Sequence, residues 1–212
     1  IDKYKARGIG VLYGAITSQC LNLGTGGEGK TMGLAPYGKK GKSILDFSKV
    51  RFEGIKTDYS CIIKRQHFTD IMSLNHNKKI ESLLVNIKKR KINDSIMKKK
   101  WRKIAFDIQA ETERCMIHLG KEINKKVKSR NICLAGGVAL NSVGNQKLFD
   151  NTNFKNISVY PACSDAGIPF GLAIWAIYNH KTFNKKKIRL KKLKNAYTGI
   201  KYNSHYINIF LK

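Results

Sequence analysis

The sequence predicts an α/β fold in which a parallel sheet is flanked by helices. Three observations support this prediction. The 212 residues, 42% of them hydrophobic, suffice for one large domain with a real core. From residue 96 onward, segments with helical spacing alternate with short apolar runs. The connections between these segments are short, which is the pattern of helices that cross over between parallel strands.

The first half of the chain predicts helices, a glycine-rich turn and a strand pair. Residues 9–23 mix apolar and small side chains without strict alternation, which indicates a helix. A turn is expected at residues 24–29, followed by a short helix that Pro36 must end. Residues 39–94 are the least informative, with a strand pair expected around residues 50–63 and a polar connection rich in Lys and Asn.

The second half gives the clearer pattern. One long helix is predicted from residue 96, with an apolar stripe made of Ile104, Ile108, Cys115, Leu119, Ile123 and Val127. Residues 131–140 predict a strand that closes at Gly136 and Gly137, and a helix follows over residues 141–149. A second strand, residues 157–161, ends at a polar turn, residues 163–167, and a buried helix is expected from there to residue 178. Ligands bind outside the carboxyl ends of parallel strands, so both turns are expected to face one crevice.

The charge of the chain is strongly unbalanced, with 41 Lys and Arg against 14 Asp and Glu and a formal net charge of +27. Such a charge fits a nucleic-acid-binding module, which stays open as an alternative. The excess lies in runs such as residues 88–91, 98–100 and 185–187, beside frequent Asn and Ile, and aromatic residues rarely interleave with it. A solvated basic surface without a nucleic-acid partner is the preferred interpretation.

Cysteine usage and hydropathy point to a reducing compartment. Five cysteines without CxxC spacing predict neither a disulfide framework nor a zinc ribbon. Cys133 and Cys163 lie in apolar runs and are expected to be buried free thiols, which suits the cytoplasm. The longest apolar stretch, residues 168–178, is shorter than the about 20 residues of a membrane span, so no membrane partner is expected. The chain begins at Ile1, as expected for a piece of a longer protein.

Residues 24–31, GTGGEGKT, match the phosphate-binding pattern GxxxxGK followed by Ser or Thr. A P-loop needs a buried strand before it and a full helix after it, so that backbone N–H groups converge on the phosphates. The preceding residues 18–23 are too polar for such a strand, and Pro36 is expected to end the next helix after about one turn. The match is therefore interpreted as a coincidence.

Two turns carry candidate site residues. At Gly136 and Gly137, paired glycines allow a nucleotide to approach the backbone, with Asn141 capping the next helix; a tight structural turn is the alternative. Asp165 follows the second strand, at the place where a metal ligand or a substrate anchor would lie. The alternative for Asp165 is the N-cap of the helix that follows it.

Three ordered blocks resemble the O-carbamoyltransferase family of the NodU and tobramycin carbamoyltransferase type. They are EGKTMGLAPYG at residues 28–38, LAGGVALNSVGN at residues 134–145 and PACSDAGIPFG at residues 161–171. The resemblance implies an actin-like, RNase H-type ATPase fold, with residues 1–194 as its second lobe and residues 195–212 as the junction to a YrdC-like domain. The first lobe, with a pair of metal-binding histidines, and the YrdC-like domain are expected to lie outside this chain.

The resemblance also implies a two-stage reaction. Carbamoyl phosphate and ATP give carbamoyl adenylate on the YrdC-like domain. The carbamoyl group then passes to an acceptor hydroxyl at the actin-like domain, where a divalent metal, expected to be iron, is bound. The resemblance assigns residues to three roles. The nucleotide is expected to contact Gly136, Gly137, Val138 and Asn141. Asp165 is expected to bind the metal, and Glu28 and Lys30 are expected to contact substrate. This piece of the chain is not expected to turn over alone.

Two alternatives to this function stay open. One is a tRNA-modifying threonylcarbamoyl-type transferase, against which the EGKTMGLAPYG block argues because the tRNA enzymes differ there. The other is the non-catalytic basic module that binds nucleic acid. The acceptor is not predicted, since a sugar, an antibiotic nucleus and a nodulation factor all present a hydroxyl. The histidines lie in no HxxxH motif and are expected to have ordinary structural roles; they are His67, His76, His118, His180 and His205.

Overall fold

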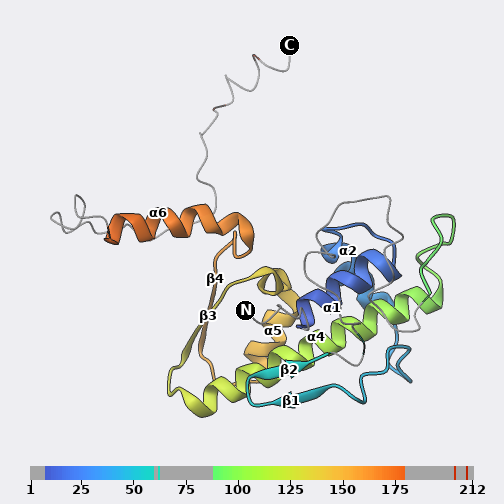
Figure 1. The fold of residues 1–212 in the computed structure, drawn as a ribbon, viewed down its shortest axis with the longest axis horizontal. Helices are drawn as coiled ribbons and strands as arrows, with labels where there is room; N and C mark the ends of the chain where they lie inside the picture. Colours follow the sequence, from blue (N-terminus) through green and yellow to red (C-terminus); the bar gives the residue numbers. More distant parts are fainter. Residues whose placement is uncertain (1–7, 60–61, 63–87, 180–202, 204–208, 210–212) are drawn as a thin grey trace, which may run out of the picture. The chain divides into compact units, whose positions relative to one another are not determined.

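The computed structural model describes residues 8–59, 62, 88–179, 203 and 209. It divides into two compact units, Ile1–Ser164 and Asp165–Lys212, which are described separately. The first unit holds most of the secondary structure, arranged around one long helix (Figure 1).

The chain enters the first unit through two short helices joined by a glycine-rich turn. Helix α1, Ile9–Ala15, continues directly into a π-helical turn, η1, Ile16–Cys20. Gly24 and Gly26 then adopt positive φ angles of 82° and 79°, so the turn depends on residues without a Cβ. Helix α2, Glu28–Leu34, leads into a single 3₁₀ turn, η2, Ala35–Tyr37. The α-helical part therefore ends just before Pro36, as predicted, after about two turns rather than one.

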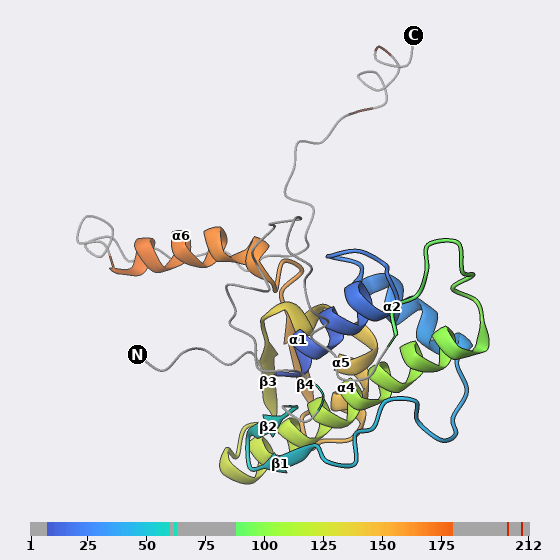
Figure 2. The same ribbon diagram turned by 45° about the vertical axis from the view of Figure 1, so that its right-hand side comes forward.

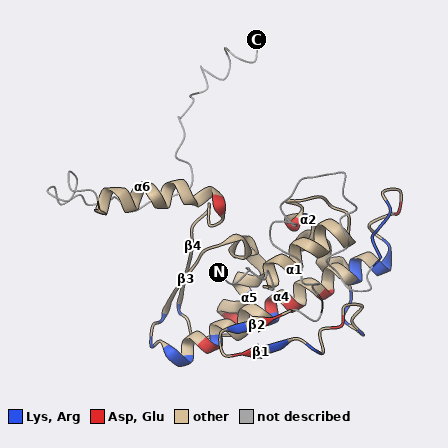
Figure 3. Cartoon of the chain, in the orientation of Figure 1, with Lys and Arg blue, Asp and Glu red and all other residues tan. Residues whose placement is uncertain are grey.

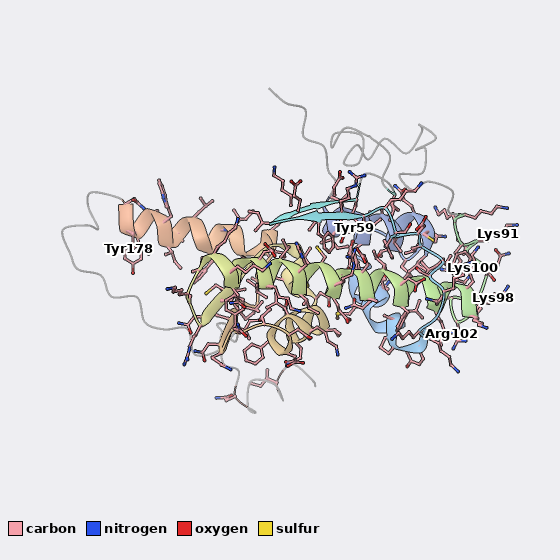
Figure 4. The ribbon with its side chains drawn as sticks, turned by 90° about the horizontal axis from the view of Figure 1, so that it is seen from below. Tyr59, Lys91, Lys98, Lys100, Arg102 and Tyr178 are labelled. Atoms are coloured by element: carbon pink, nitrogen blue, oxygen red, sulfur yellow. The ribbon has the colours of Figure 1, made fainter. Side chains whose placement is uncertain are left out.

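A small hairpin packs against the long helix. Strands β1, Arg51–Glu53, and β2, Lys56–Asp58, pair in the antiparallel sense, which confirms the predicted strand pair. Helix α4 spans Lys99–Lys126 and buries the predicted stripe in its first two thirds. Just after the hairpin, the hydroxyl of the fully buried Tyr59 donates to Glu111 Oε1 at 3.0 Å (Figure 4). The predicted polar connection after it falls largely outside the described residues.

One ion pair fixes the hairpin face of α4. Arg114 donates from Nε and Nη2 to the two oxygens of Glu111, at 2.7 and 2.6 Å. The same guanidinium lies 4.1 Å from the centroid of the Phe52 ring, on β1. Glu111 is buried, and its two oxygens are both paired, so its charge is neutralised where water is excluded.

The predicted parallel layer is present at the far end of α4. Strand β3, Asn131–Leu134, pairs in parallel with β4, Asn156–Val159, and Ile132 lies opposite Ile157. The crossover between them consists of a 3₁₀ turn, η3, Gly137–Leu140, and helix α5, Ser142–Asp150. The two strands therefore end at the same edge of the sheet, where the glycine turn begins.

Two clusters of buried side chains form the core of the first unit. The larger one joins α1, η1 and α2 to the first half of α4, and Figures 1 and 2 show α1 lying alongside α4 in both views. A smaller cluster of Met116, Leu148 and Phe154 joins α4, α5 and the segment just before β4. Gly38 contacts α4 so closely that a Cβ would lie 2.5 Å from the Arg102 carbonyl oxygen. Close packing of this kind holds the EGKTMGLAPYG segment to the long helix.

One face of strand β3 is exposed, and the predicted burial of Cys133 is therefore wrong. Cys133 is an exposed thiol, whereas Cys163 is buried as expected. Ile132 and Leu134 point to the smaller cluster, so Cys133 lies on the opposite face, which no described element of the first unit covers. Cys20 and Cys115 are also free and buried.

The second unit contains a 3₁₀ turn, η4, Asp165–Gly167, and helix α6, Ile168–Asn179. The helix forms where it was predicted, but the described residues of the second unit do not bury it. Its large side chains are exposed, including Trp175. Tyr178, labelled in Figure 4, is another. Burial was inferred from its apolar composition, whereas exposure depends on what packs against it. Among the described residues, no helix is both long and apolar enough to cross a membrane.

Candidate functional site

The strongest candidate site is the glycine turn that follows β3. Gly136 has φ 97° and ψ 165°, a combination open to glycine alone. Its N–H donates to the Cys163 carbonyl oxygen at 2.6 Å. This bond joins the loops that follow the two parallel strands, so the ends of β3 and β4 are tied together within the first unit.

The turn leaves room for a ligand at the backbone. A Cβ added at Gly137 would meet no heavy atom within 4 Å, and both Gly136 and Gly137 are exposed. Val138, in contrast, packs inward: a Cβ at Gly10 on α1 would lie 3.0 Å from Val138 Cγ2. The turn is therefore anchored on α1 by one side chain while its glycine backbone faces outward.

Two asparagines tie the turn to helix α5. Asn141 is the N-cap, and its Oδ1 accepts from the Gly144 N–H at 2.9 Å, as predicted. Asn145 donates from Nδ2 to the Ala139 carbonyl oxygen at 2.8 Å. The Asn145 Oδ1 atom is buried, and no partner for it lies in the described part of the chain.

A polar network lies beneath the turn and joins three helices. Gln109, in the middle of α4, exchanges two hydrogen bonds with the Asn141 side chain, at 3.1 and 2.9 Å. Gln109 also donates to Glu113 Oε1 at 3.0 Å and accepts from the Tyr13 hydroxyl at 3.0 Å. Burial, then the charges of Glu28 and Glu113, raise the pKa of Tyr13 well above its ordinary value, so its hydroxyl stays a donor.

Of the two residues expected to contact substrate, one lies at this network. Glu28 is half-buried, and its Oε1 atom lies 3.3 Å from the position of a Cβ on Gly14 of α1, one residue after Tyr13. Lys30 is exposed, and its side chain has no hydrogen bond or ion pair to the described residues. Glu28 and the glycine turn therefore lie against the same short helix.

The structure also excludes the P-loop interpretation. The residues before the glycine-rich turn form η1, which is a π-helical turn and not a strand. The hydroxyl that a P-loop would offer to a metal ion belongs to Thr31. Thr31 is fully buried and lies 2.8 Å from the Thr17 hydroxyl. The Thr31 hydroxyl therefore lies in the contact between α2 and η1, where it cannot bind a metal ion.

A metal site is not assembled by the described residues. They include no group of three or more His, Cys, Asp and Glu side chains placed to hold an ion. Asp165 is exposed in η4, in the second unit. His118 has a structural role, since its Nε2 atom lies 2.7 Å from the Gly54 carbonyl oxygen and its ring lies 4.7 Å from that of Phe52. The other four histidines fall outside the described residues.

Basic residues concentrate at the ends of α4 (Figure 3). At its beginning, Lys98, Lys100 and Arg102 gather with Lys91 of the preceding loop (Figure 4). This loop is held by Arg90, which donates from Nε to the Leu21 carbonyl oxygen at 2.7 Å. Trp101, the aromatic residue within the lysine run, is buried and donates to Asp94 at 2.8 Å. Its ring is therefore not available for stacking on a base.

Sequence reasoning found the turn but missed the network below it. Gly136, Gly137, Val138 and Asn141 were assigned from a block of consecutive residues. Tyr13, Gln109 and Glu113 lie in none of the three blocks. The available signal was the spacing of Gln109 and Glu113, which are four residues apart on one helix face where apolar residues would be expected.

Comparison with known proteins identifies the relatives of the chain. A family model described as the N-terminus of carbamoyltransferases matches residues 3–174. An uncharacterized protein of Synechocystis is 32% identical over 206 residues, which cover 96% of this chain and 33% of that protein. Nodulation protein NolO of Bradyrhizobium diazoefficiens is 31% identical over 158 residues, covering 74% of this chain and 26% of that protein.

A second nodulation protein, NolNO of Sinorhizobium fredii, is 28% identical over 167 residues, which cover 78% of this chain and 22% of that protein. The chain thus spans a third or less of the length of each of these curated relatives. All three candidate blocks begin within the part of the chain that the family model matches.

Proposed function

The chain belongs to the carbamoyltransferase family through the N-terminal domain of that family, and from this premise we propose that it serves in the transfer of a carbamoyl group to a hydroxyl. The proposed reaction consumes carbamoyl phosphate and ATP and passes through carbamoyl adenylate. In this proposal the chain is the second lobe of an actin-like domain, and a YrdC-like domain makes the adenylate. The acceptor class is a hydroxyl of a sugar or another small molecule.

The observation that carries the nucleotide part of this proposal is the open turn after β3. Gly137 has free space where a side chain would be, and Gly136 has a backbone conformation that only glycine adopts readily. The N-cap of α5 follows directly, so the positive end of a helix lies beside the turn. These features suit the adenosine and phosphate of an adenylate.

Two residues near the turn suit different groups of the substrates, one as a hydrogen-bond donor and one as an acceptor. Asn141 can donate a hydrogen bond from its amide, and the Glu28 carboxylate can only accept, which suits a hydroxyl group. When the acceptor oxygen attacks the carbamoyl carbon, the bond from that carbon to the phosphate oxygen breaks. AMP then leaves with the bonding electrons, and the hydroxyl proton is released. The residues of this chain would align the two substrates for that displacement.

Asp165 is proposed as one ligand of a divalent metal, iron being the expected ion. The described residues supply no group that could complete the site. In the proposal the remaining ligands are histidines of the first lobe. A bound ion would act as a Lewis acid on the carbamoyl carbonyl.

Carbamoyl transfer by the protein expressed from its whole gene tests the proposed function. The protein receives carbon-labelled carbamoyl phosphate, ATP, ferrous iron and a panel of hydroxyl acceptors. We expect label on an acceptor and an equal amount of AMP, because each transfer releases one AMP. Label that reaches no acceptor, or transfer without AMP, would contradict the proposal. The 212-residue chain alone is expected to be inactive, since aligning two reactants supplies about 7–11 kcal/mol of barrier reduction and needs the whole crevice.

The role of Asp165 has a separate test. Metal content is measured in the whole protein and in its Asp165→Asn variant. A ligand role predicts a clear loss of bound iron, because a neutral amide binds a divalent cation less strongly than a charged carboxylate does. A capping role predicts equal metal content, because Asn caps a helix about as well as Asp.

A further inference from the structure

Gln109 is an unusual residue for the buried face of a long helix. It is 5% exposed, and all four of its side-chain hydrogen-bonding positions are used. Its two amide protons go to Glu113 and Asn141, and its oxygen accepts from Tyr13 and Asn141. Burying an amide is costly unless it is fully bonded, and here it is fully bonded. An apolar side chain of similar size would fill the same space without that requirement.

The groups at the two ends of the network fix the orientation of both amides. At one end the Gly144 N–H can only donate, so the Asn141 oxygen must face it. At the other end the Glu113 carboxylate accepts, so the Gln109 nitrogen must face it. The two amides therefore pair in one orientation only, in which the nitrogen of each donates to the oxygen of the other. Tyr13, which stays protonated, completes the set as a donor.

This arrangement does more than the helix cap requires. A cap needs one oxygen that accepts from Gly144, and a serine would provide it. The pairing with Gln109 additionally holds the Asn141 nitrogen and uses only one of its two protons. The second proton meets no acceptor in the described part of the chain. Asn141 is half-buried and close to the exposed glycine turn in sequence, so that proton remains available to a ligand.

We propose that Gln109 is the positioning residue of the nucleotide turn, which holds the Asn141 amide so that its free N–H meets the bound adenylate. This inference rests on the proposed function, because it assumes that the turn binds a nucleotide. Gln109 acts through Asn141 and does not itself touch the ligand. In this proposal the position of the Asn141 amide depends on Gln109, a residue 32 positions away in sequence.

The first test is a double-mutant cycle on the affinity for AMP of the protein expressed from its whole gene, measured by calorimetry. Gln109→Met keeps the length of the side chain and removes its hydrogen bonds, and we expect AMP binding to weaken on the order of tenfold, as for one lost hydrogen bond. Asn141→Ser keeps the cap and removes the amide. In that background Gln109→Met should have no further effect on AMP affinity.

Other variants make the result specific. Gln146→Met, which removes an exposed bond to Asp150 on α5, is the matched control and should leave AMP affinity unchanged. Glu113→Gln alters the network at its half-exposed outer end. This variant replaces Gln109→Met in the test if Gln109→Met does not fold. We expect it to lower AMP affinity threefold or more. Equal losses for Gln109→Met in both backgrounds would show a merely structural role and would overturn the inference.

A second readout separates this inference from the proposed function. Amide hydrogen exchange at Gly144 reports whether Asn141 is held in place, with or without a nucleotide. We expect exchange at Gly144 to become several times faster in Gln109→Met and to stay unchanged in Gln146→Met. If the wild-type protein expressed from its whole gene does not bind AMP, the proposed nucleotide role of the turn fails, while Gly144 still reports on Gln109. Unchanged exchange at Gly144 in Gln109→Met would overturn the positioning role itself.

Discussion

At the scale of single residues, the two adjacent glycines of the turn serve different purposes. Gly136 provides a conformation that other residues adopt only at a cost of about 1–3 kcal/mol. Gly137 provides space, because nothing lies within 4 Å of the position where its Cβ would be. One glycine is therefore explained by the fold and the other by the proposed ligand.

Substitution of each glycine should separate these purposes. We expect Gly136→Ala to lower the free energy of unfolding by about 1–3 kcal/mol. Gly137→Val should change the free energy of unfolding by less than about 0.5 kcal/mol, as is usual at an open surface position. The valine side chain should nevertheless lower AMP affinity at least tenfold by occupying the ligand's space. Urea unfolding and calorimetric titration with AMP measure the two effects.

The outcome that contradicts this assignment is a Gly137→Val chain with wild-type AMP affinity. Gly29→Val offers a matched control, because a Cβ added at Gly29 would also meet nothing within 4 Å, and Gly29 lies on α2, away from the turn that follows β3 in sequence. It should leave AMP affinity unchanged, and its free energy of unfolding should be equal to or slightly above that of wild type, because glycine is a poorer helix former than valine.

The residue scale also shows what the sequence could and could not reveal. Asn141 was assigned as a cap because an Asn directly before a helical pattern has a local signature, and the bond to Gly144 confirms it. Gln109 has no such signature for the turn, because the two partners that tie it to other helices, Tyr13 and Asn141, are 96 and 32 residues away in sequence. Cys133 was expected to be buried because its neighbours are apolar. Alternation along a strand places it on the face opposite to theirs.

At the scale of elements, the contact between η1 and α2 depends on one pair of buried hydroxyls. Thr17 and Thr31 are 2.8 Å apart and have no exposed surface. We expect Thr17→Val or Thr31→Val alone to lower the free energy of unfolding by about 1–3 kcal/mol, because the remaining hydroxyl is left buried without its partner. The double variant should be much closer to wild type, since both polar groups are gone and the shape is kept.

The measurement is a double-mutant cycle by urea unfolding. Thr112→Val is the control, because the Thr112 hydroxyl bonds to the Ile108 carbonyl oxygen within the same helix. Its effect should add to that of Thr17→Val. If the effects of Thr17→Val and Thr31→Val also simply add, the two hydroxyls are not coupled and the contact has another basis.

Secondary structure was largely predictable because most elements have a local pattern. The stripe of α4 repeats over several turns, and the strands β3 and β4 are each followed by a glycine or polar turn. The π-helical closure of η1 was not predicted, since the pattern of residues 9–23 indicates one continuous helix. Composition predicted the helix α6 correctly but not the exposure of its side chains, because burial depends on neighbours that no local pattern specifies.

At the scale of the whole molecule, buried thiols and phenols, Cys115 among them, set how stability responds to alkali. Burial raises the pKa of Cys20 from 9.0 to about 11, and burial is also the largest cause that raises the pKa of Tyr13 and of Tyr59 above the ordinary value of 10.0. Well below pH 9 these groups are protonated in both the folded and the unfolded state, so they add no pH dependence there. Above their ordinary pKa values only the unfolded chain loses the protons. Stability should therefore fall as the pH rises, by about 1.4 kcal/mol per pH unit for each group.

Tyr59→Phe tests this response. The variant should lose less stability than wild type between pH 10 and 11, because one group that deprotonates only on unfolding has been removed. Unfolding by urea at pH 8, 9, 10 and 11 gives the slope. Tyr37→Phe is the control, since Tyr37 is 59% exposed. Identical slopes for the two variants would contradict the assignment of alkaline sensitivity to the buried hydroxyl.

The π-helical turn also limits how this stretch of chain can change by insertion or deletion during evolution. The Leu21 N–H donates to the Ile16 carbonyl oxygen at 2.8 Å, five residues back, so η1 contains one residue more than an α-helical turn. Each residue of a helix turns its successors by about 100°. Loss of one residue after Ile16 would therefore rotate Leu21 away from the core, or Tyr13 away from Gln109. Homologous genes that keep both contacts should align without a gap across this turn.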